Sequence, residues 1–301
     1  MSLKMILAAV AASLSLASTS VLASPDQSAP LPPISQERIS VKVEGVGTDV
    51  ILVPGLASSP KIWADLASKL KQSHRLHLVQ IAGFAGSPAA PDPDGKVAAP
   101  TADAVAEYIR HQRIEAPVII GHSLGGEVAL MLGARYPDRV GRLMVVDALP
   151  FYPLMFDPSA TSETAAPYAA QMRDAMLMAS PEQNEAMQGA SIARLAKTEA
   201  VRPGLVVAAT RSDRRTVADA MFELMVTDLR PELSRIKVPV EVVYAYDELY
   251  GVPASEIDAL FRNAYVSTPV VSFTRIDGSF HFVMLDQPER FNGAVQTFLE
   301  R

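Results

Sequence analysis

Short apolar segments alternate with segments of helical periodicity along most of this chain. Each apolar segment is short enough for a buried strand, and Gly, Pro or Asp residues end several of them. The segments that we interpret as strands are 38–44, 50–53, 76–81, 118–120, 143–146, 240–246 and 270–276. The segments with helical spacing include 62–70, 102–112, 127–135 and 287–299. Because such alternation is typical of parallel strands joined by helical crossovers, it predicts an α/β fold with a mostly parallel central sheet flanked by helices.

The alternation is interrupted between residues 151 and 235. This region has helical character, and only 205–208 is a potential strand. It holds seven of the twelve methionines, namely Met155, Met172, Met176, Met178, Met187, Met221 and Met225. Methionine is unbranched and fits varied apolar shapes, so these residues form ordinary helix core or line an apolar pocket, and one helix can do both. We therefore predict a helical cap at 151–235, inserted into a core formed by 38–150 and 236–301.

The charge and residue content exclude several classes of protein. With a net charge of −6, the chain lacks the basic excess that a nucleic-acid-binding protein needs to neutralise phosphates. It contains no cysteine, which excludes disulfides, thiolate zinc sites, iron–sulfur ligation and a cysteine nucleophile. Its five histidines are scattered and form no HExxH motif, so we expect no metal site.

The first residues have the pattern of a secretory signal peptide. Lys4 precedes the apolar run 5–12, serines and threonines follow, and Val21-Leu22-Ala23 supplies the small-x-small pattern of a cleavage site. The apolar run is too short to span a bilayer comfortably, so we expect cleavage after Ala23 and no stable membrane anchor. Residues 24–37 are then a linker, rich in proline at their start. The mature protein is expected outside the cytoplasm, either secreted or in the periplasm.

The most specific motif of the chain centres on Ser123. The apolar segment 118–120 leads into Gly121-His122-Ser123-Leu124-Gly125-Gly126, and a helical segment follows. A strand, a sharp turn and a helix form the setting of a nucleophile elbow, in which the serine has a strained backbone and small residues must flank it. Such a turn exposes the hydroxyl at the carboxyl edge of the sheet, beside the N-terminus of a helix that favours negative charge. We therefore predict that Ser123 is a nucleophile.

This motif and its surroundings resemble the α/β-hydrolase fold family, and the resemblance extends from about residue 41 to residue 299. In that family the nucleophile, the acid and the histidine of the catalytic triad follow one another along the chain. His281 is the one histidine after the last predicted strand, and it precedes the final helix, where the family has its catalytic base. The resemblance therefore implies that His281 takes the proton of Ser123, in a reaction that needs no cofactor.

Three carboxylates are candidates for the acid of the triad. Asp247 ends the strand predicted at 240–246 and is followed by Glu248. Members of the family usually have glycine, two further residues and then aspartate in this loop, whereas here Ala245 stands at the glycine position, which leaves both residues open. We choose Asp247, because a short carboxylate on a short loop suits an acid that orients a histidine. Asp147, at the end of the preceding strand, is the third candidate, since some relatives place the acid there.

The resemblance also indicates where a developing oxyanion would be stabilised. One donor is the backbone N–H of Leu124, directly after the nucleophile. The second is the backbone N–H of Leu56, in the turn Val53-Pro54-Gly55-Leu56 that follows an early strand. Pro54 replaces the histidine that is usual there in the family, and this change does not remove the donor.

Together, the motif and the resemblance imply a serine hydrolase that cleaves a small or apolar ester through an acyl-enzyme, most simply a carboxylesterase. Its partner is then a small-molecule ester rather than a nucleic acid. Serine at the elbow argues against the dehalogenases and epoxide hydrolases of this fold, which use aspartate. The same triad serves lactonases, thioesterases, amidases and perhydrolases, so these activities stay open, as does a non-catalytic binding protein that keeps the fold.

Overall fold

The computed structural model of the chain describes residues 37–91 and 94–301. The signal peptide predicted at 1–23 and all but the last residue of the linker predicted at 24–37 lie outside the described residues. Within the described ranges, no helix is long and apolar enough to cross a membrane.

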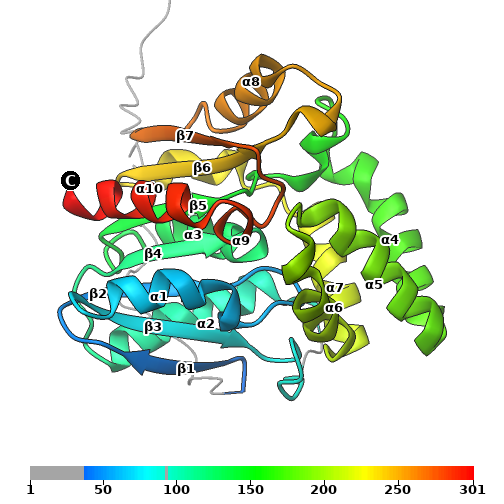
Figure 1. Cartoon of the computed structure of the whole chain (residues 1–301), viewed down its shortest axis with the longest axis horizontal. Coiled ribbons are helices and arrows are strands. Elements are labelled where there is room, and N and C mark those ends of the chain that lie inside the picture. The colour runs from blue at the N-terminus through cyan, green and yellow to red at the C-terminus, as the bar shows by residue number, and fades with distance from the viewer. Residues whose placement is uncertain (1–36, 92–93) are drawn as a thin grey trace, which may run out of the picture. The chain divides into compact units, whose positions relative to one another are not determined.

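A seven-stranded sheet forms the centre of the fold, in the order β1-β3-β2-β4-β5-β6-β7. Its strands are β1 (Ile39–Glu44), β2 (Thr48–Val53), β3 (His74–Ile81), β4 (Val118–His122), β5 (Arg142–Val146), β6 (Val240–Tyr246) and β7 (Val271–Asp277). The edge strand β1 runs antiparallel to β3, and every other pair of neighbours is parallel. This topology confirms the predicted α/β class with a mostly parallel sheet (Figure 1).

Helices cover both faces of the sheet (Figure 1). The helices of the core are α1 (Ala64–Leu70), α2 (Ala98–His111), α3 (Leu124–Arg135), α8 (Ala254–Ala264), α9 (Val283–Asp286) and α10 (Pro288–Glu300). Ile51 and Ile119 pack on one side with residues of α2, α3 and α8, while Leu52 and Ile120 pack on the other with residues of α1 and α10. Because the central strands are buried on both faces, they are continuous apolar runs, which is why the sequence reveals them clearly.

The region between β5 and β6 consists of helices at one end of the sheet (Figure 1). The longer ones are α4 (Ser162–Met178), α5 (Pro181–Leu195), α6 (Arg202–Thr210) and α7 (Arg214–Val226). We call residues 151–235, which contain these four helices, the cap. Thr161 and Ser180 begin α4 and α5 with capping boxes, in which each side chain accepts a hydrogen bond from the backbone N–H three residues later.

The potential strand at 205–208 is wrong, because these residues lie within α6. Four consecutive apolar residues fit a buried strand and a buried helical turn equally well. The Arg202-Pro203 start, with proline in the first turn, favours the helix here.

Candidate active site

Ser123 occupies the turn between β4 and α3 with φ 54° and ψ −120°. This backbone conformation is unfavourable for a residue with a side chain and costs about 1–3 kcal/mol. The flanking glycines make it sterically feasible. A Cβ at Gly121 would lie 1.9 Å from the carbonyl oxygen of Gly125, and a Cβ at Gly125 would lie 2.2 Å from the carbonyl oxygen of Val53. The strand–turn–helix geometry predicted for the elbow is therefore present, with Ser123 half-buried at its apex.

His281 pairs with Asp147. The Nδ1 atom of the histidine lies 2.7 Å from Oδ2 of the carboxylate. The other carboxylate oxygen, Oδ1, accepts a hydrogen bond of 2.9 Å from the backbone N–H of Ala245. The backbone of Asp147 is itself fixed, since its N–H donates to the carbonyl of Val243 at 2.7 Å. Both oxygens of Asp147 are thus engaged, and its position at the end of β5 orients the imidazole.

Asp247, our choice for the acid, is held elsewhere. Its carboxylate accepts hydrogen bonds from Nζ of Lys197 and from the backbone N–H of Leu249. Burial alone would raise the pKa of Asp247, but these hydrogen bonds outweigh it and hold the pKa below its usual value. The structure therefore corrects our assignment, because Nδ1 of His281 meets Asp147 and the carboxylate of Asp247 is paired with a lysine of the cap. Glu248, the other alternative in that loop, is exposed at the start of the short helix η5 (Glu248–Tyr250).

His122, inside the elbow, supports the loop of His281. Its Nε2 donates to the backbone carbonyl of His281 at 3.0 Å, and the two rings lie 4.5 Å apart between centroids. Burial lowers the pKa of His122 well below its usual value, and the neighbouring His281 adds to this effect, so His122 is neutral. Trp63 and Phe282 pack against its ring. His122 therefore holds the backbone of His281, a contact that the sequence did not reveal.

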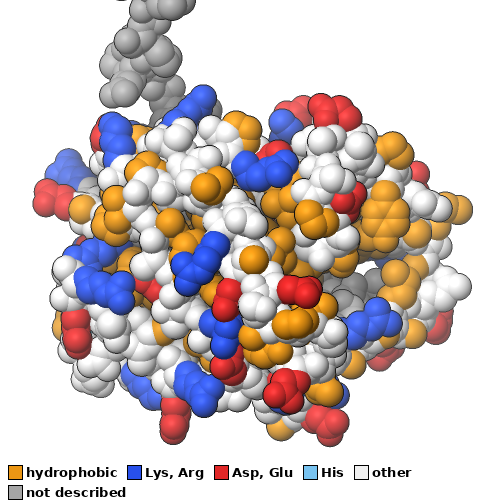
Figure 2. All heavy atoms as spheres, turned by 90° about the horizontal axis from the view of Figure 1, so that it is seen from above, with side chains coloured by type: hydrophobic (Ala, Val, Ile, Leu, Met, Phe, Trp, Pro, Cys, Tyr) orange, Lys and Arg blue, Asp and Glu red, His pale blue; other side chains and the backbone are white. Residues whose placement is uncertain are grey.

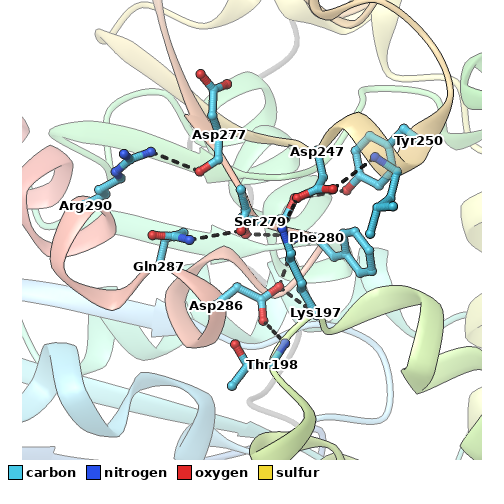
Figure 3. A network of polar contacts seen from close by, with 12 residues as sticks. Lys197, Thr198, Asp247, Tyr250, Asp277, Ser279, Phe280, Asp286, Gln287 and Arg290 are labelled. Carbon is cyan, nitrogen blue, oxygen red and sulfur yellow. Dashed lines mark hydrogen bonds and ion pairs between the residues drawn. The ribbon is translucent and has the colours of Figure 1, made fainter.

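A network of polar contacts ties the loop of His281 to the cap (Figure 3). Asp286, in α9, accepts three backbone hydrogen bonds, from Lys197 at 3.0 Å, Thr198 at 2.8 Å and Phe280 at 2.9 Å. The first two donors follow α5 of the cap, and the third directly precedes His281. One carboxylate thus fixes the position of the cap relative to the histidine.

The remaining three histidines lie outside this arrangement. His77, in β3, contacts Asp49 through Nε2 and the hydroxyl of Tyr108 through Nδ1, each at 2.7 Å. His74 contacts Ser73, and His111 contacts Glu107. Among residues 37–91 and 94–301, no group of three or more His, Asp or Glu side chains is placed to hold a metal ion.

A cavity of about 950 Å³ opens between the cap and the carboxyl ends of the strands. Ser123, Asp147 and His281 line it together with Leu56 and Leu124, the two residues predicted to supply oxyanion donors. A Cβ at Gly55 would lie 3.0 Å from Cβ of Ser123, so the turn after β2 passes directly beside the serine. The arrangement can hold an acyl group over Ser123 with backbone N–H groups nearby.

The cap contributes methionines to this cavity. This agrees with the interpretation that the methionine-rich helices line an apolar pocket. The methionines that line it are Met155, Met172, Met176, Met187 and Met221. Met225 is instead buried, and Met178 is 86% exposed. Further apolar side chains, including Phe156 and Tyr168, are exposed on the cap. Figure 2 shows orange side chains gathered toward the right-hand end of one face, the end at which Figure 1 places α4 and α5.

Known proteins share this sequence pattern and fold. The sequence model described as the alpha/beta hydrolase family matches residues 50–294. A pimeloyl-[acyl-carrier protein] methyl ester esterase of Edwardsiella ictaluri is 30% identical over 263 residues, covering 84% of this chain and 93% of the relative. A human (lyso)-N-acylphosphatidylethanolamine lipase is 27% identical, covering 83% of this chain and 78% of the relative.

Among solved structures, the enol-lactonase of Burkholderia xenovorans LB400 is similar to this fold, with a TM-score of 0.72 and 19% identity over 90% of this chain and all of the other. A thermophilic esterase of Thermogutta terrifontis has a TM-score of 0.69 and 22% identity, covering 87% of this chain and 93% of the other. The sheet order, the elbow at Ser123 and the family match over most of the chain agree, and the protein belongs to the alpha/beta hydrolase family.

Proposed function

We propose that the protein is a serine hydrolase of carboxylic esters, with Ser123 as nucleophile, His281 as base and Asp147 as the acid that orients the base. The observation that carries this proposal is the 2.7 Å contact between His281 and Asp147 in the lining of an apolar cavity that the strained Ser123 also lines. Named relatives that cleave esters, such as the methyl ester esterase of Edwardsiella ictaluri, support the reaction class.

The proposed reaction has two halves. The Ser123 oxygen attacks the ester carbonyl while Nε2 of His281 takes the hydroxyl proton, since Nδ1 is held by Asp147. The carbonyl oxygen becomes an oxyanion, which the backbone N–H groups of Leu56 and Leu124 stabilise. Collapse breaks the ester bond, and the alcohol leaves with the proton from His281. A water molecule then attacks the acyl-enzyme by the same steps and releases the acid and the free serine.

The cavity favours esters with an apolar portion. Its lining is predominantly apolar and contains several methionines, whose flexible side chains accommodate different shapes. Its volume of about 950 Å³ is sufficient for a medium-sized molecule. We infer a small or medium apolar ester as substrate, and a lactone, which is a cyclic ester, fits the same chemistry.

The test is release of p-nitrophenol from acetate, butyrate, octanoate and palmitate esters, with lactones, thioesters and amides assayed alongside. Ser123→Ala is expected to abolish turnover, while Ser68→Ala, a change at an exposed serine of α1, serves as the matched control. A fluorophosphonate probe should label the wild type and Ser68→Ala but not Ser123→Ala. Turnover by Ser123→Ala close to that of the wild type would contradict the proposed nucleophile.

We also propose that residues 1–23 direct the protein out of the cytoplasm and are removed after Ala23. The support is the pattern of Lys4, a short apolar run and small residues before the cleavage site. The test is cell fractionation followed by N-terminal sequencing of the recovered protein. A mature chain that begins at Ser24 outside the cytoplasm is expected, and an intact Met1 in the cytoplasmic fraction would refute the proposal.

A further inference from the structure

A buried glutamate lines the cavity without a partner for one of its oxygens. Glu127 lies on α3, about one helical turn beyond Ser123, and is 2% exposed. It belongs to the lining of the cavity that contains Ser123 and His281. Its Oε2 atom has no hydrogen-bond partner among the described residues. Buried polar atoms nearly always have a partner, so an unpaired carboxyl oxygen beside a cavity indicates a group that pairs with something the cavity receives.

Other buried glutamates of the described chain are paired. Glu223 accepts backbone hydrogen bonds from the start of α2, at Val97, Ala98 and Ala99. Glu241 contacts Ser272, Thr274 and Arg301. The hydroxyl of Tyr265 donates to the carbonyl of Ala148 at 2.7 Å and not to Glu127. The fold therefore satisfies carboxyl groups of this kind elsewhere, whereas the Glu127 carboxyl lines the cavity with its Oε2 atom unpaired among the described residues.

Burial raises the pKa of the Glu127 carboxyl well above its usual value, and the negative charge of Glu223 adds to the shift. The site therefore favours the neutral, protonated form of this carboxyl, which carries a hydroxyl hydrogen. A neutral carboxyl in an apolar cavity is a hydrogen-bond donor, and it discriminates strongly between a ligand that offers an acceptor oxygen and one that does not.

We propose, resting on the ester hydrolysis proposed above, that Glu127 forms a polar subsite that donates a hydrogen bond to an uncharged oxygen on the acyl chain of the substrate. The acyl group is the part that stays bonded to Ser123, at the start of the helix that carries Glu127. Four residues of helix separate the two, a rise of about 6 Å. The favoured substrate is therefore an ester whose acyl chain carries a carbonyl oxygen a few carbons from the ester group.

The experiment compares p-nitrophenyl levulinate with p-nitrophenyl valerate. The two acyl chains have equal length, and only the levulinate chain carries a ketone. For the wild type we expect kcat/KM for levulinate to exceed that for valerate by about tenfold, the effect of one buried hydrogen bond. Glu127→Leu should reduce the ratio to about one, while Glu127→Gln, whose amide also donates, should keep most of it.

Glu241→Gln is the matched control, because Glu241 is equally buried but lies outside the cavity lining. It should leave the levulinate-to-valerate ratio as in the wild type. If Glu127→Leu still unfolds cooperatively on heating and its levulinate-to-valerate ratio of kcat/KM equals that of the wild type, the proposed subsite is overturned. If Glu127→Leu does not fold, the subsite is overturned when the wild type and Glu127→Gln each hydrolyse levulinate and valerate with equal kcat/KM.

A binding measurement separates failure of the subsite from failure of the hydrolase. Calorimetric titration of Ser123→Ala with methyl levulinate and methyl valerate reports on binding without turnover. Tighter binding of levulinate that is lost in Ser123→Ala/Glu127→Leu supports the subsite even if no ester is hydrolysed. Serine-dependent hydrolysis with equal binding and equal rates for both esters would leave the hydrolase standing and refute the subsite.

Discussion

Replacing Asp147 with asparagine should disable the protein while keeping its shape. Asparagine has nearly the same size as aspartate, and its carbonyl oxygen can still accept from the N–H of Ala245, as Oδ1 does now at 2.9 Å. The amide nitrogen would then face Nδ1 of His281, where Oδ2 lies at 2.7 Å. Because that nitrogen donates, Nδ1 must become the acceptor and the ring proton moves to Nε2. A histidine protonated at Nε2 cannot take the proton of Ser123.

The size of the effect follows from two losses. The imidazolium that forms during the reaction loses its negatively charged partner, and the neutral ring is held in the wrong tautomer. The pair is partly shielded from water, with side-chain exposures of 22% for His281 and 11% for Asp147, so solvent replaces little of the lost interaction. We expect kcat to fall by about 10³–10⁴-fold, which corresponds to about 4–5 kcal/mol of transition-state stabilisation.

The assay is steady-state hydrolysis of p-nitrophenyl butyrate by Asp147→Asn and Asp247→Asn, with circular dichroism as a check of folding. Asp247→Asn removes an ion pair with Lys197, whose side chain is 43% exposed, and should change kcat by less than about tenfold. If Asp247→Asn loses as much activity as Asp147→Asn, or if Asp147→Asn stays within tenfold of the wild type, the argument from the His281 contact is refuted.

Three further changes test other parts of the structure. Asp286→Ala should remove three backbone hydrogen bonds and so loosen the loop of His281. We expect kcat to fall at least about tenfold, with a smaller change in KM. Equal changes in kcat and KM would argue for a role in substrate binding instead. Glu127→Gln should flatten the pH dependence of stability. Because the pKa of Glu127 is raised in the folded state, its contribution to the stability of the wild type is complete below about pH 4.5 and is lost as the pH rises. The difference in Tm, variant minus wild type, should therefore increase from about pH 5 to about pH 8. Gly125→Ala should cost at least about 2 kcal/mol in urea unfolding because its Cβ would meet the carbonyl of Val53, whereas Gly189→Ala, with no atom within 4 Å, should stabilise α5 slightly.

Local sequence was sufficient for the sheet and for the elbow at Ser123 because each depends on neighbouring residues. Central strands are continuous apolar runs, and the elbow needs small residues at fixed spacing around Ser123, both of which are visible in a single stretch of chain. The helix α8 went unpredicted because the interpretation rested on apolar runs, whereas the apolar residues of α8 are interspersed with polar ones: Phe261 and Ala264 are buried, and Ile257 and Leu260 are partly buried against the core. The segment 205–208 was assigned wrongly because four apolar residues do not distinguish a helix from a strand.

The pairing of His281 with Asp147 rather than with Asp247, our choice from the sequence, was missed because it is fixed by three-dimensional proximity. Asp147 and Asp247 both follow buried strands, and β5 and β6 are neighbours in the sheet, so each carboxylate begins at the edge where the site forms. The choice between them depends on the path of the loop that carries His281, which no local pattern reveals. In the structure, the N–H of Ala245 is the group that holds Asp147.

The backbone at the carboxyl edge explains why Asp147 suits this role. Ser123 and Asp147 directly follow neighbouring strands, and both have positive φ, 54° and 48°. The N–H of Ser123 donates to Val146 at 2.9 Å, and the N–H of Asp147 donates to Val243 at 2.7 Å, so the hydrogen-bond ladder continues through both strained residues. The register that positions Ser123 therefore positions Asp147 as well. An acid at Asp247 would depend on a separate loop and on its ion pair with Lys197 of the cap, whereas the backbone of Asp147 is held by the sheet itself.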